Sequence, residues 1–360
     1  MKENIMCCPD DLIINLHATS KCNLNCKYCY DKKIKLKDPI YRIDDLINFI
    51  IQTGCRNLDI MFYGGEPTCN IDFIEEVINN LSLLQTPKSI FQLQTNGTLL
   101  TTITPIILNK FYQILISFDG IEKTMDNQRG QGVYKKVVNN INQIRKYYNN
   151  PIIARMTLTN HTSLESDLLE AYNIFDYIHF QIDNSMSLEH HQVFFKAYKN
   201  ATSILFSNWI KDLTDNKKKY ILPFLGIILY DYYIKNDSTY FYCSPGYYCL
   251  TIDTSGNIFS CPEGTYHSKH FEAINCYMGN IKDTQFSPKI HERKKICKDC
   301  DIFHICMGRC IWTNEKMYCE ATRFLVNQLR KNKNLIEKLI DFSNLPTTLI
   351  NAIEAVEIIP

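Results

Sequence analysis

Short apolar runs alternate with helical segments through the first half of the chain. Each run carries β-branched or aromatic residues and is bounded by Gly, Asn, Asp or Thr, which is typical of β-strands. The sequence therefore predicts six strands, at residues 12–16, 58–63, 90–94, 113–118, 152–158 and 177–182.

Helical periodicity fills the intervals between these runs. In residues 71–84, an apolar stripe is formed by Ile71, Ile74, Val77, Ile78 and Leu81. Six strand–helix alternations predict an α/β fold with a parallel sheet, open or closed into a partial TIM-like (β/α)6 barrel. Functional residues are then expected at the carboxyl ends of the strands. Further helices are expected near 43–53, 102–111, 133–148 and 163–174.

The pattern changes after residue 190. A helical stretch leads into a Tyr-rich segment at 230–243, and cysteines are dense from Cys243 to Cys319. An amphipathic helix is expected over 321–342, packed back on the body. We predict three parts: a barrel at 1–235, a Cys-rich domain at 236–325 and a helical tail at 326–360.

Composition excludes several classes of protein. The 360 residues are 45% hydrophobic and 21% charged, with a net charge of +1 and scattered Lys and Arg, so neither nucleic acid nor an acidic membrane is an expected partner. The longest apolar run, at 220–233, is too short to span a membrane and contains Pro223. Acidic residues also interrupt the first sixteen positions, where a signal peptide has its apolar core. We expect a cytoplasmic protein.

Sixteen cysteines are the unusual feature of this composition. In a reducing compartment they are poor candidates for disulfides, and their clustering favours metal binding. Cys22, Cys26 and Cys29 follow the first predicted strand within eight positions. Three thiolates leave one coordination position open, as in catalytic metal sites. The alternatives are an incomplete zinc site and a chance spacing.

The C-x3-C-x2-C spacing, with Tyr28 before the last cysteine, resembles the signature of radical S-adenosylmethionine (radical SAM) enzymes. The resemblance covers essentially the whole chain. It implies a 4Fe–4S cluster held by Cys22, Cys26 and Cys29, whose open iron is chelated by the amino and carboxylate groups of SAM. In that family an electron entering the cluster cleaves SAM, and the resulting 5′-deoxyadenosyl radical abstracts a hydrogen from the substrate.

A second family motif, Gly64-Gly65-Glu66-Pro67, follows the second predicted strand. In radical SAM enzymes this loop contacts the amino group of SAM. Two glycines permit close backbone approach to a ligand, and a carboxylate accepts hydrogen bonds from an ammonium group. By itself the segment would be an ordinary turn.

Two later segments, after the third and fourth predicted strands, also resemble the SAM pocket of that family. They place Asn96, Ser117 and Asp119 as cofactor-binding residues, with Ser117 near the ribose. Arg155, on the fifth strand, is the expected partner of the cofactor carboxylate, because a guanidinium fork matches a carboxylate. The alternative for Arg155 is a surface charge.

The C-terminal cysteines read C-x5-C-x6-G-x4-C, then C-x2-C-x5-C-x3-C, then Cys319. This pattern resembles the SPASM extension of radical SAM enzymes that modify peptides and proteins, which binds two auxiliary 4Fe–4S clusters. The implied cofactors are therefore SAM and three 4Fe–4S clusters, and the alternative is a pair of interleaved zinc sites. By position, the first auxiliary cluster is held by Cys243, Cys249, Cys261 and Cys310, and the second by Cys297, Cys300, Cys306 and Cys319. No role is assigned to Cys7, Cys8, Cys55, Cys69 and Cys276.

Two groups within this resemblance differ in substrate. Anaerobic sulfatase-maturating enzymes oxidise a protein Cys or Ser to formylglycine and carry an Asp directly after the cysteine that matches Cys261. Here Pro262 follows Cys261, so Glu263 is the candidate catalytic base. The other group matures ribosomally synthesised peptides, often with an N-terminal leader-binding winged helix, which we expect to be absent because so few residues precede the first strand. We expect peptide maturation through a thioether or carbon–carbon cross-link, with formylglycine formation as the alternative.

The expected partners are a peptide or protein substrate and an electron donor such as flavodoxin or ferredoxin. A hypothesis of a different class is an iron–sulfur protein for electron transfer or scaffolding. An electron carrier has no use for an open iron or for the Gly-Gly-Glu-Pro loop, and these features favour the enzyme.

Overall fold

The structure of the protein is a computed structural model in which two compact units are distinguished. Unit 1 comprises Met1–Ile114, Asn139–Asn150 and Cys243–His291, and unit 2 comprises Leu115–Val138, Pro151–Tyr242 and Glu292–Pro360. The residues described are 10–29, 38–183, 191–234, 245–267, 276–283, 288–289, 291, 297, 299–310 and 316–354.

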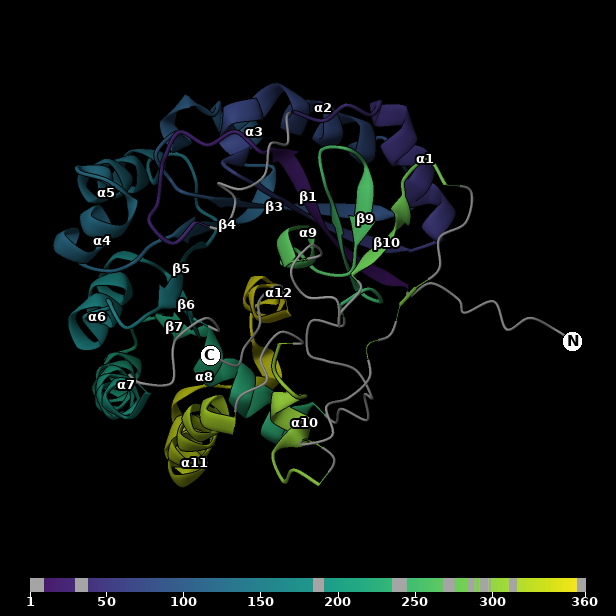
Figure 1. Cartoon of the computed structure of the whole chain (residues 1–360). Helices are drawn as coiled ribbons and strands as arrows, with labels where there is room; N and C mark the ends of the chain where they lie inside the picture. Colours follow the sequence, from purple (N-terminus) through teal and green to yellow (C-terminus); the bar gives the residue numbers. More distant parts are fainter. Residues whose placement is uncertain are drawn as a thin grey trace, which may run out of the picture. The chain divides into compact units, whose positions relative to one another are not determined.

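Unit 1 is built on a largely parallel sheet. Its strands are β1 (Asp11–Thr19), β2 (Asn57–Gly64), β3 (Lys88–Thr95), β8 (Cys249–Ile252), β9 (Asn257–Phe259) and β10 (Tyr277–Asn280). β1 pairs in parallel with β2 and β8, so Ile14 lies opposite both Ile60 and Leu250. β9 and β10 extend the β8 edge in antiparallel fashion. Figure 1 shows these green segments beside the purple β1, so strands from the beginning and the later part of the chain share one sheet.

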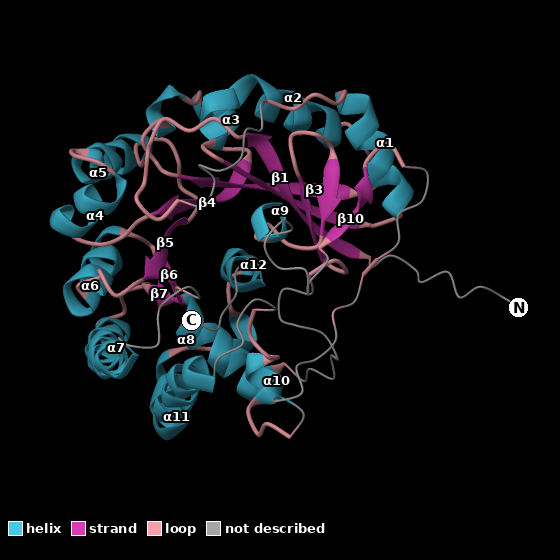
Figure 2. Ribbon diagram, in the orientation of Figure 1, coloured by secondary structure: helices cyan, strands magenta, loops and turns pink. Residues whose placement is uncertain are grey.

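Helices α1 (Ile43–Thr53) and α2 (Ile71–Ser82) cover the strands of unit 1 on one side (Figure 2). α1 ends at Gly54, whose φ of 70° is in the left-handed region that glycine adopts without strain. α2 buries Ile74, Val77, Ile78 and Leu81 as its apolar stripe predicts, with Phe73 in place of the half-buried Ile71. The 3.6-residue period therefore identifies the buried face of α2 correctly.

β4 (Phe111–Ser117) begins in unit 1 and ends in unit 2. In unit 2, β5 (Ile152–Leu158) pairs in parallel with β6 (Tyr177–Ile182), and β6 pairs with the short β7 (Tyr220–Ile221). Among the described strands the sheet ends at β10 on one edge and at β7 on the other, so it is open. The six predicted strands and the α/β partial-barrel fold are confirmed.

Two of the helix predictions needed correction. The helix predicted at 102–111 shrinks to α3 (Pro105–Leu108), because Pro105 sets its start and β4 already begins at Phe111. The helix predicted at 133–148 is α5 (Val133–Ile144), and α4 (Glu122–Arg129) before it was missed. α4 contains one apolar side chain, Met125, and so has no amphipathic period to detect.

The other helices of unit 2 include the C-terminal tail. They are α6 (Leu164–Ile174), α7 (His191–Thr214), α8 (Leu222–Ile228), α10 (Phe303–Cys306), α11 (Lys316–Leu339) and α12 (Thr347–Glu354). α11 packs beside α7 (Figures 1 and 2), where the rings of Phe195 and Tyr318 lie 6.5 Å apart. The predicted tail helix is thus present and packs back on the body. Among the described helices, none has the length and apolarity needed to cross a lipid bilayer.

Candidate functional site

The three cysteines of the N-terminal motif lie on the loop after β1. Cys26 is buried, and the backbone N–H of Cys29 donates to the Cys26 carbonyl at 3.3 Å. Partial burial raises the pKa of the Cys22 thiol to about 11, and the nearby Cys26 and Cys29 thiols add to the increase. Tyr28, next to Cys29, is 37% exposed. The loop therefore gathers three sulfur donors.

The Gly-Gly-Glu-Pro segment lies directly against the start of this cysteine loop. The backbone N–H of Gly65 donates to the Thr19 carbonyl at 3.0 Å, and that of Glu66 donates to the Lys21 carbonyl at 2.8 Å. A Cβ on Gly64 would lie 2.1 Å from the Thr19 oxygen, and one on Gly65 would lie 2.5 Å from the Lys21 oxygen. Both glycines are therefore required for the close approach of the two loops.

Glu66 is fully buried and joins the segment to the loop after β3. Its Oε1 accepts from the hydroxyls of Thr68 and Thr95 at 2.5 and 2.6 Å, and its Oε2 accepts from the backbone N–H of Asn96 at 2.6 Å. Burial raises the pKa of Glu66, and these hydrogen bonds oppose the increase. Pro67 is buried at the first position of the short 3-10 helix Pro67–Asn70. The role predicted for Glu66 toward the amino group of SAM stays a prediction.

Asn96 connects the loop after β3 with the cysteines. Its Nδ2 donates to Asn23 Oδ1 at 2.9 Å and lies 3.9 Å from Cys22 Sγ. Its Oδ1 accepts from the backbone N–H of Thr98 at 2.9 Å. Unit 1 thus brings together the three-cysteine motif, the Gly-Gly-Glu-Pro segment and Asn96. Sequence reasoning missed Asn23, Thr95 and Thr98, because short polar residues beside a motif carry no spacing signal.

Unit 2 holds the other predicted cofactor residues. Asp119 is buried and paired with Arg129, whose Nε and Nη2 donate to its two oxygens at 2.8 and 3.0 Å. This bidentate contact fixes the carboxylate. Ser117 is half-buried at the end of β4. Sequence reasoning missed Arg129, which lies on the unpredicted helix α4.

Arg155 projects from β5 onto neighbours of β6. Its Nη1 lies 3.0 Å from His179 Nδ1, and its Nη2 donates to Gln181 Oε1 at 3.2 Å. Because guanidinium has no acceptor, His179 Nδ1 must be the unprotonated nitrogen of a neutral ring. These two contacts therefore hold the Arg155 side chain in place. Its partnership with a cofactor carboxylate remains a prediction.

The first auxiliary set falls partly outside the described residues, since Cys243 is not among them. Cys249 begins β8, and Asn15 Nδ2 of β1 donates to its sulfur at 3.1 Å. Cys261 is buried after β9, and the backbone N–H of Gly264 donates to its carbonyl at 3.0 Å. Glu263 is half-buried in that turn. Cys310 belongs to unit 2, so its grouping with Cys249 and Cys261 stays a prediction.

The second auxiliary set lies within unit 2. Burial raises the pKa of Cys306 to about 11, and Cys319 and Cys297 add to the increase, which places their thiols near it. Cys300 shares a turn with Cys297, because its backbone N–H donates to the Cys297 carbonyl at 3.4 Å. Arg323 of α11 donates to Cys300 Sγ at 3.4 Å. The structure therefore gathers Cys297, Cys300, Cys306 and Cys319 around α10 and the first turns of α11.

The donor sets fit the groups that the sequence implies. Thiolates are the ligands of iron–sulfur clusters and also suit zinc. An anionic cluster further requires nearby positive charge or N–H donors, and the second set has both in Arg309 and Arg323. Among the described residues, no group of three or more His, Cys, Asp or Glu side chains is arranged to hold a single metal ion.

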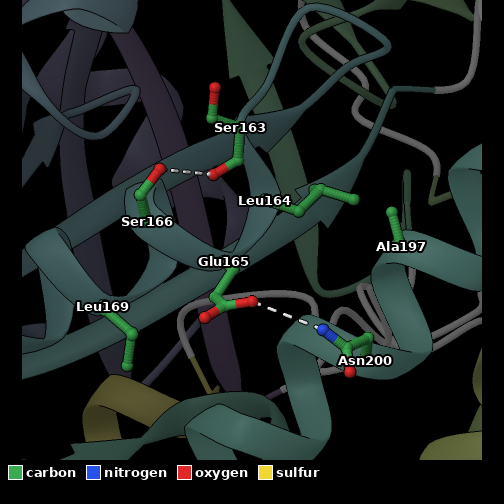
Figure 3. Close-up of a pocket in the computed structure, with 7 residues that line it drawn as sticks. All are labelled: Ser163, Leu164, Glu165, Ser166, Leu169, Ala197 and Asn200. Carbon is green, nitrogen blue, oxygen red and sulfur yellow. Dashed lines mark hydrogen bonds between the residues drawn. The ribbon is translucent and has the colours of Figure 1, made fainter.

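A surface pocket of about 500 Å³ lies elsewhere, between α6 and α7 (Figure 3). Glu165 and Asn200 face each other across it, with Asn200 Nδ2 donating to Glu165 Oε2 at 3.3 Å. Ser166 Oγ donates to the Ser163 carbonyl at 3.1 Å. Its lining contains no cysteine and no residue of the predicted motifs, so it does not belong to the candidate site.

His17, on β1, gives the fold a predicted sensitivity to acid. Its ring is buried 5.3 Å from the Tyr63 ring, and burial lowers its pKa from 6.5 to about 4. Between these values the unfolded chain binds a proton that the folded chain does not, so stability present above pH 6.5 is lost as the pH falls. We expect His17 to reduce the free energy of unfolding by about 2 kcal/mol at pH 5.

Urea unfolding of the wild type and His17→Gln at pH 8 and pH 5 measures this contribution. The glutamine variant cannot take up the proton and should lose less stability between the two pH values. Equal losses in both proteins would contradict the assignment to His17.

Comparison with known proteins identifies a family for the part of the chain that holds the three-cysteine motif and the Gly-Gly-Glu-Pro segment. Residues 16–172 match the Radical SAM superfamily. A radical SAM cyclopropyl synthase, TigE, of Paramaledivibacter caminithermalis is 23% identical over 92% of this chain and 76% of its own length. A cysteine-type anaerobic sulfatase-maturating enzyme of Clostridium novyi is 22% identical over 84% of this chain and 91% of its own.

Two solved structures share the fold. The enzyme anSMEcpe with bound AdoMet and the Cp18Cys peptide has a TM-score of 0.67 at 20% identity, covering 92% of this chain and 99% of that chain. SuiB of Streptococcus suis, bound to its precursor peptide SuiA, has a TM-score of 0.54 at 16% identity, covering 86% and 74%. Both of these structures contain a bound peptide.

Proposed function

This chain is a radical SAM enzyme with its radical SAM domain at residues 16–172, and from that premise we propose that it matures a ribosomally synthesised peptide. Its relatives and structural neighbours modify peptides or proteins, which sets the class of reaction. The proposed product is a thioether or carbon–carbon cross-link. Pro262 favours this product over formylglycine. It occupies the position at which sulfatase-maturating enzymes have an Asp that acts as the base, and proline has no ionisable group.

The proposed cofactors are SAM and three 4Fe–4S clusters. When bound, they supply an electron and a carbon-centred radical, the chemistry that the side chains lack. Cys22, Cys26 and Cys29 would hold the SAM-binding cluster. The remaining eight cysteines of the motifs would hold the two auxiliary clusters, within a SPASM domain at 236–325 that follows the barrel at 1–235 and precedes the tail at 326–360. The limit at 235/236 falls outside the described residues.

In this proposal the chain's own residues position the reactants and exclude water. Glu66 holds two loops together through buried hydrogen bonds, so the cysteine loop and the loop of Asn96 keep a fixed separation. Preorganisation of this kind lowers the barrier, since reactive groups need no rearrangement at the moment of reaction. In unit 2, Asp119 is fixed by Arg129, and Arg155 is fixed by His179 and Gln181. An electron donor such as flavodoxin or ferredoxin is the proposed partner, and the cytoplasm the proposed location.

Formylglycine formation is the second candidate function. It is favoured by the sulfatase-maturating relative, which matches 84% of this chain. That reaction needs a base, and Glu263 is the ionisable residue closest in sequence after Cys261. The two products differ chemically, because a cross-link removes two hydrogens while formylglycine replaces a thiol with an aldehyde.

An anaerobic assay tests both functions. Reconstituted full-length protein is incubated with dithionite, SAM and either a Cys-rich peptide encoded beside the gene or a Cys-containing sulfatase peptide. We expect 5′-deoxyadenosine and loss of two hydrogens from the first peptide. Aldehyde in the second peptide would favour formylglycine formation, and absence of 5′-deoxyadenosine under all conditions would refute the enzyme proposal.

The Glu263→Gln variant tests the base. We expect it to cleave SAM normally while product formation falls by about a hundredfold, as removal of a general base does. Glu76→Gln, on the exposed surface of α2, is the matched control and should retain both activities. An unchanged product yield in Glu263→Gln would remove Glu263 from the mechanism.

A further inference from the structure

Arg309 is a buried guanidinium beside the second auxiliary set. It is 6% exposed and lies three residues after Cys306, to whose carbonyl its backbone N–H donates. Its Nη1 donates to Thr322 Oγ1 at 2.8 Å and to the Tyr318 carbonyl at 3.3 Å, whereas its Nε has no hydrogen-bond partner. Within the described part of the chain no carboxylate forms an ion pair with it. Its guanidinium also lies over the Tyr318 ring, 5.2 Å from the ring centre. These partners are all neutral, so a nearby anion would stabilise the buried charge further.

The backbone around Arg309 is held in an unusual conformation. Met307, Gly308 and Arg309 have φ values of 47°, 86° and 58°, all in the left-handed region. Only Gly308 adopts this region freely, so the other two carry strain that the surrounding structure must offset. In the same turn the backbone N–H of Arg309 donates to the Cys306 carbonyl at 3.0 Å. The chain is therefore strained at the point where it places positive charge and a donor beside a predicted cluster ligand.

A second guanidinium approaches the set from α11. Arg323 Nη2 donates to Cys300 Sγ at 3.4 Å, while its Nη1 pairs with Asp301 Oδ1 at 2.7 Å. Its side chain is 43% exposed, so this contact lies at the surface. Asp301 orients the guanidinium group of Arg323, and Nη2 of that group remains directed at the Cys300 sulfur. Two arginines of different elements therefore face two cysteines of one set.

We propose that Arg309 and Arg323 raise the reduction potential of the 4Fe–4S cluster held by Cys297, Cys300, Cys306 and Cys319, with Arg309 as its buried counter-ion and Arg323 as a donor to the Cys300 sulfur. This rests on the auxiliary-cluster assignment of the proposed function. A four-thiolate cluster is anionic, and one added electron increases its negative charge. Positive charge and hydrogen bonds to sulfur stabilise the reduced form more than the oxidised form.

A redox titration tests the proposal without SAM cleavage. Full-length protein with Cys22, Cys26 and Cys29 changed to Ala retains only the auxiliary clusters, which are reduced by dithionite and followed by electron paramagnetic resonance. At the parent midpoint potential, Arg323→Gln should lower the ratio of reduced to oxidised cluster by about tenfold, a shift of ~59 mV for one electron. Arg323→Lys keeps the positive charge but not the planar guanidinium group, so its midpoint potential should shift less than that of Arg323→Gln.

Lys331→Gln is the matched control, because it removes one exposed charge from the same helix without a contact to sulfur. Its midpoint potential should equal that of the parent.

Arg309→Lys and Arg309→Met probe the buried site, with iron and sulfide content measured to detect loss of the cluster. Full cluster content with an unchanged midpoint in Arg323→Gln would overturn this inference and leave the proposed function intact. Zinc in place of iron would instead overturn the cluster assignment, and this inference with it.

Discussion

Replacing Cys26 with alanine is expected to abolish the formation of 5′-deoxyadenosine in the anaerobic assay and to remove the proposed SAM-binding cluster from the protein. Cys26 is the buried member of the three-cysteine loop, and its carbonyl also closes the turn to Cys29. In the proposed function three cysteines hold the SAM-binding cluster, so the loss of Cys26 leaves two of these ligands. Iron and sulfide analysis together with chromatographic measurement of 5′-deoxyadenosine checks both effects.

Cys55→Ala is the matched control for that experiment. Cys55 is also buried in unit 1, with 3% of its surface exposed against 9% for Cys26, but it belongs to none of the motifs. Its thiol packs as a small apolar side chain, so its removal should cost stability while leaving iron content and SAM cleavage unchanged. If Cys26→Ala still forms 5′-deoxyadenosine at the wild-type rate, the assignment of the three-cysteine motif is wrong.

The central strands were predictable because each is a compact apolar run with turn residues on both sides. β1 to β6 all follow this pattern, and their order along the chain sets the parallel topology. β8, β9 and β10 were missed for a physical reason. They are three or four residues long, and β8 acquires its partner β1 from the other end of unit 1. Pairing across such a separation leaves no local signal in the sequence.

The residues of the candidate site also fall into two groups, those that the sequence reveals and those that it does not. Cys22, Cys26, Cys29 and the Gly-Gly-Glu-Pro segment are recognisable because their chemistry depends on residue type at fixed spacing. The connections of Glu66 to Thr95 and Asn96 are not recognisable, since they join loops about thirty positions apart. The buried charge of Arg309 also escapes sequence reasoning, because an arginine in a Gly-Arg-Cys segment is usually exposed. Burial and partner identity are properties of the tertiary fold.

Changing Gly65 to alanine should reduce SAM cleavage by about a hundredfold, because a displacement of about 1 Å at a reactive centre has an effect of that size. The new Cβ would lie 2.5 Å from the Lys21 carbonyl oxygen and 2.6 Å from that of Ser20, both of them backbone atoms that cannot rotate away. The loop that begins with Cys22 must therefore shift, and the hydrogen bond from the Glu66 N–H to the Lys21 carbonyl must lengthen.

Gly54→Ala is the control in the same unit: its φ of 70° imposes strain on any side chain, yet no atom lies within 4 Å of the added Cβ. That variant should lose some stability and keep its activity, which separates backbone strain from displacement of the cysteine loop. Normal 5′-deoxyadenosine formation by Gly65→Ala would mean that the contact between the two loops does not position the cluster ligands.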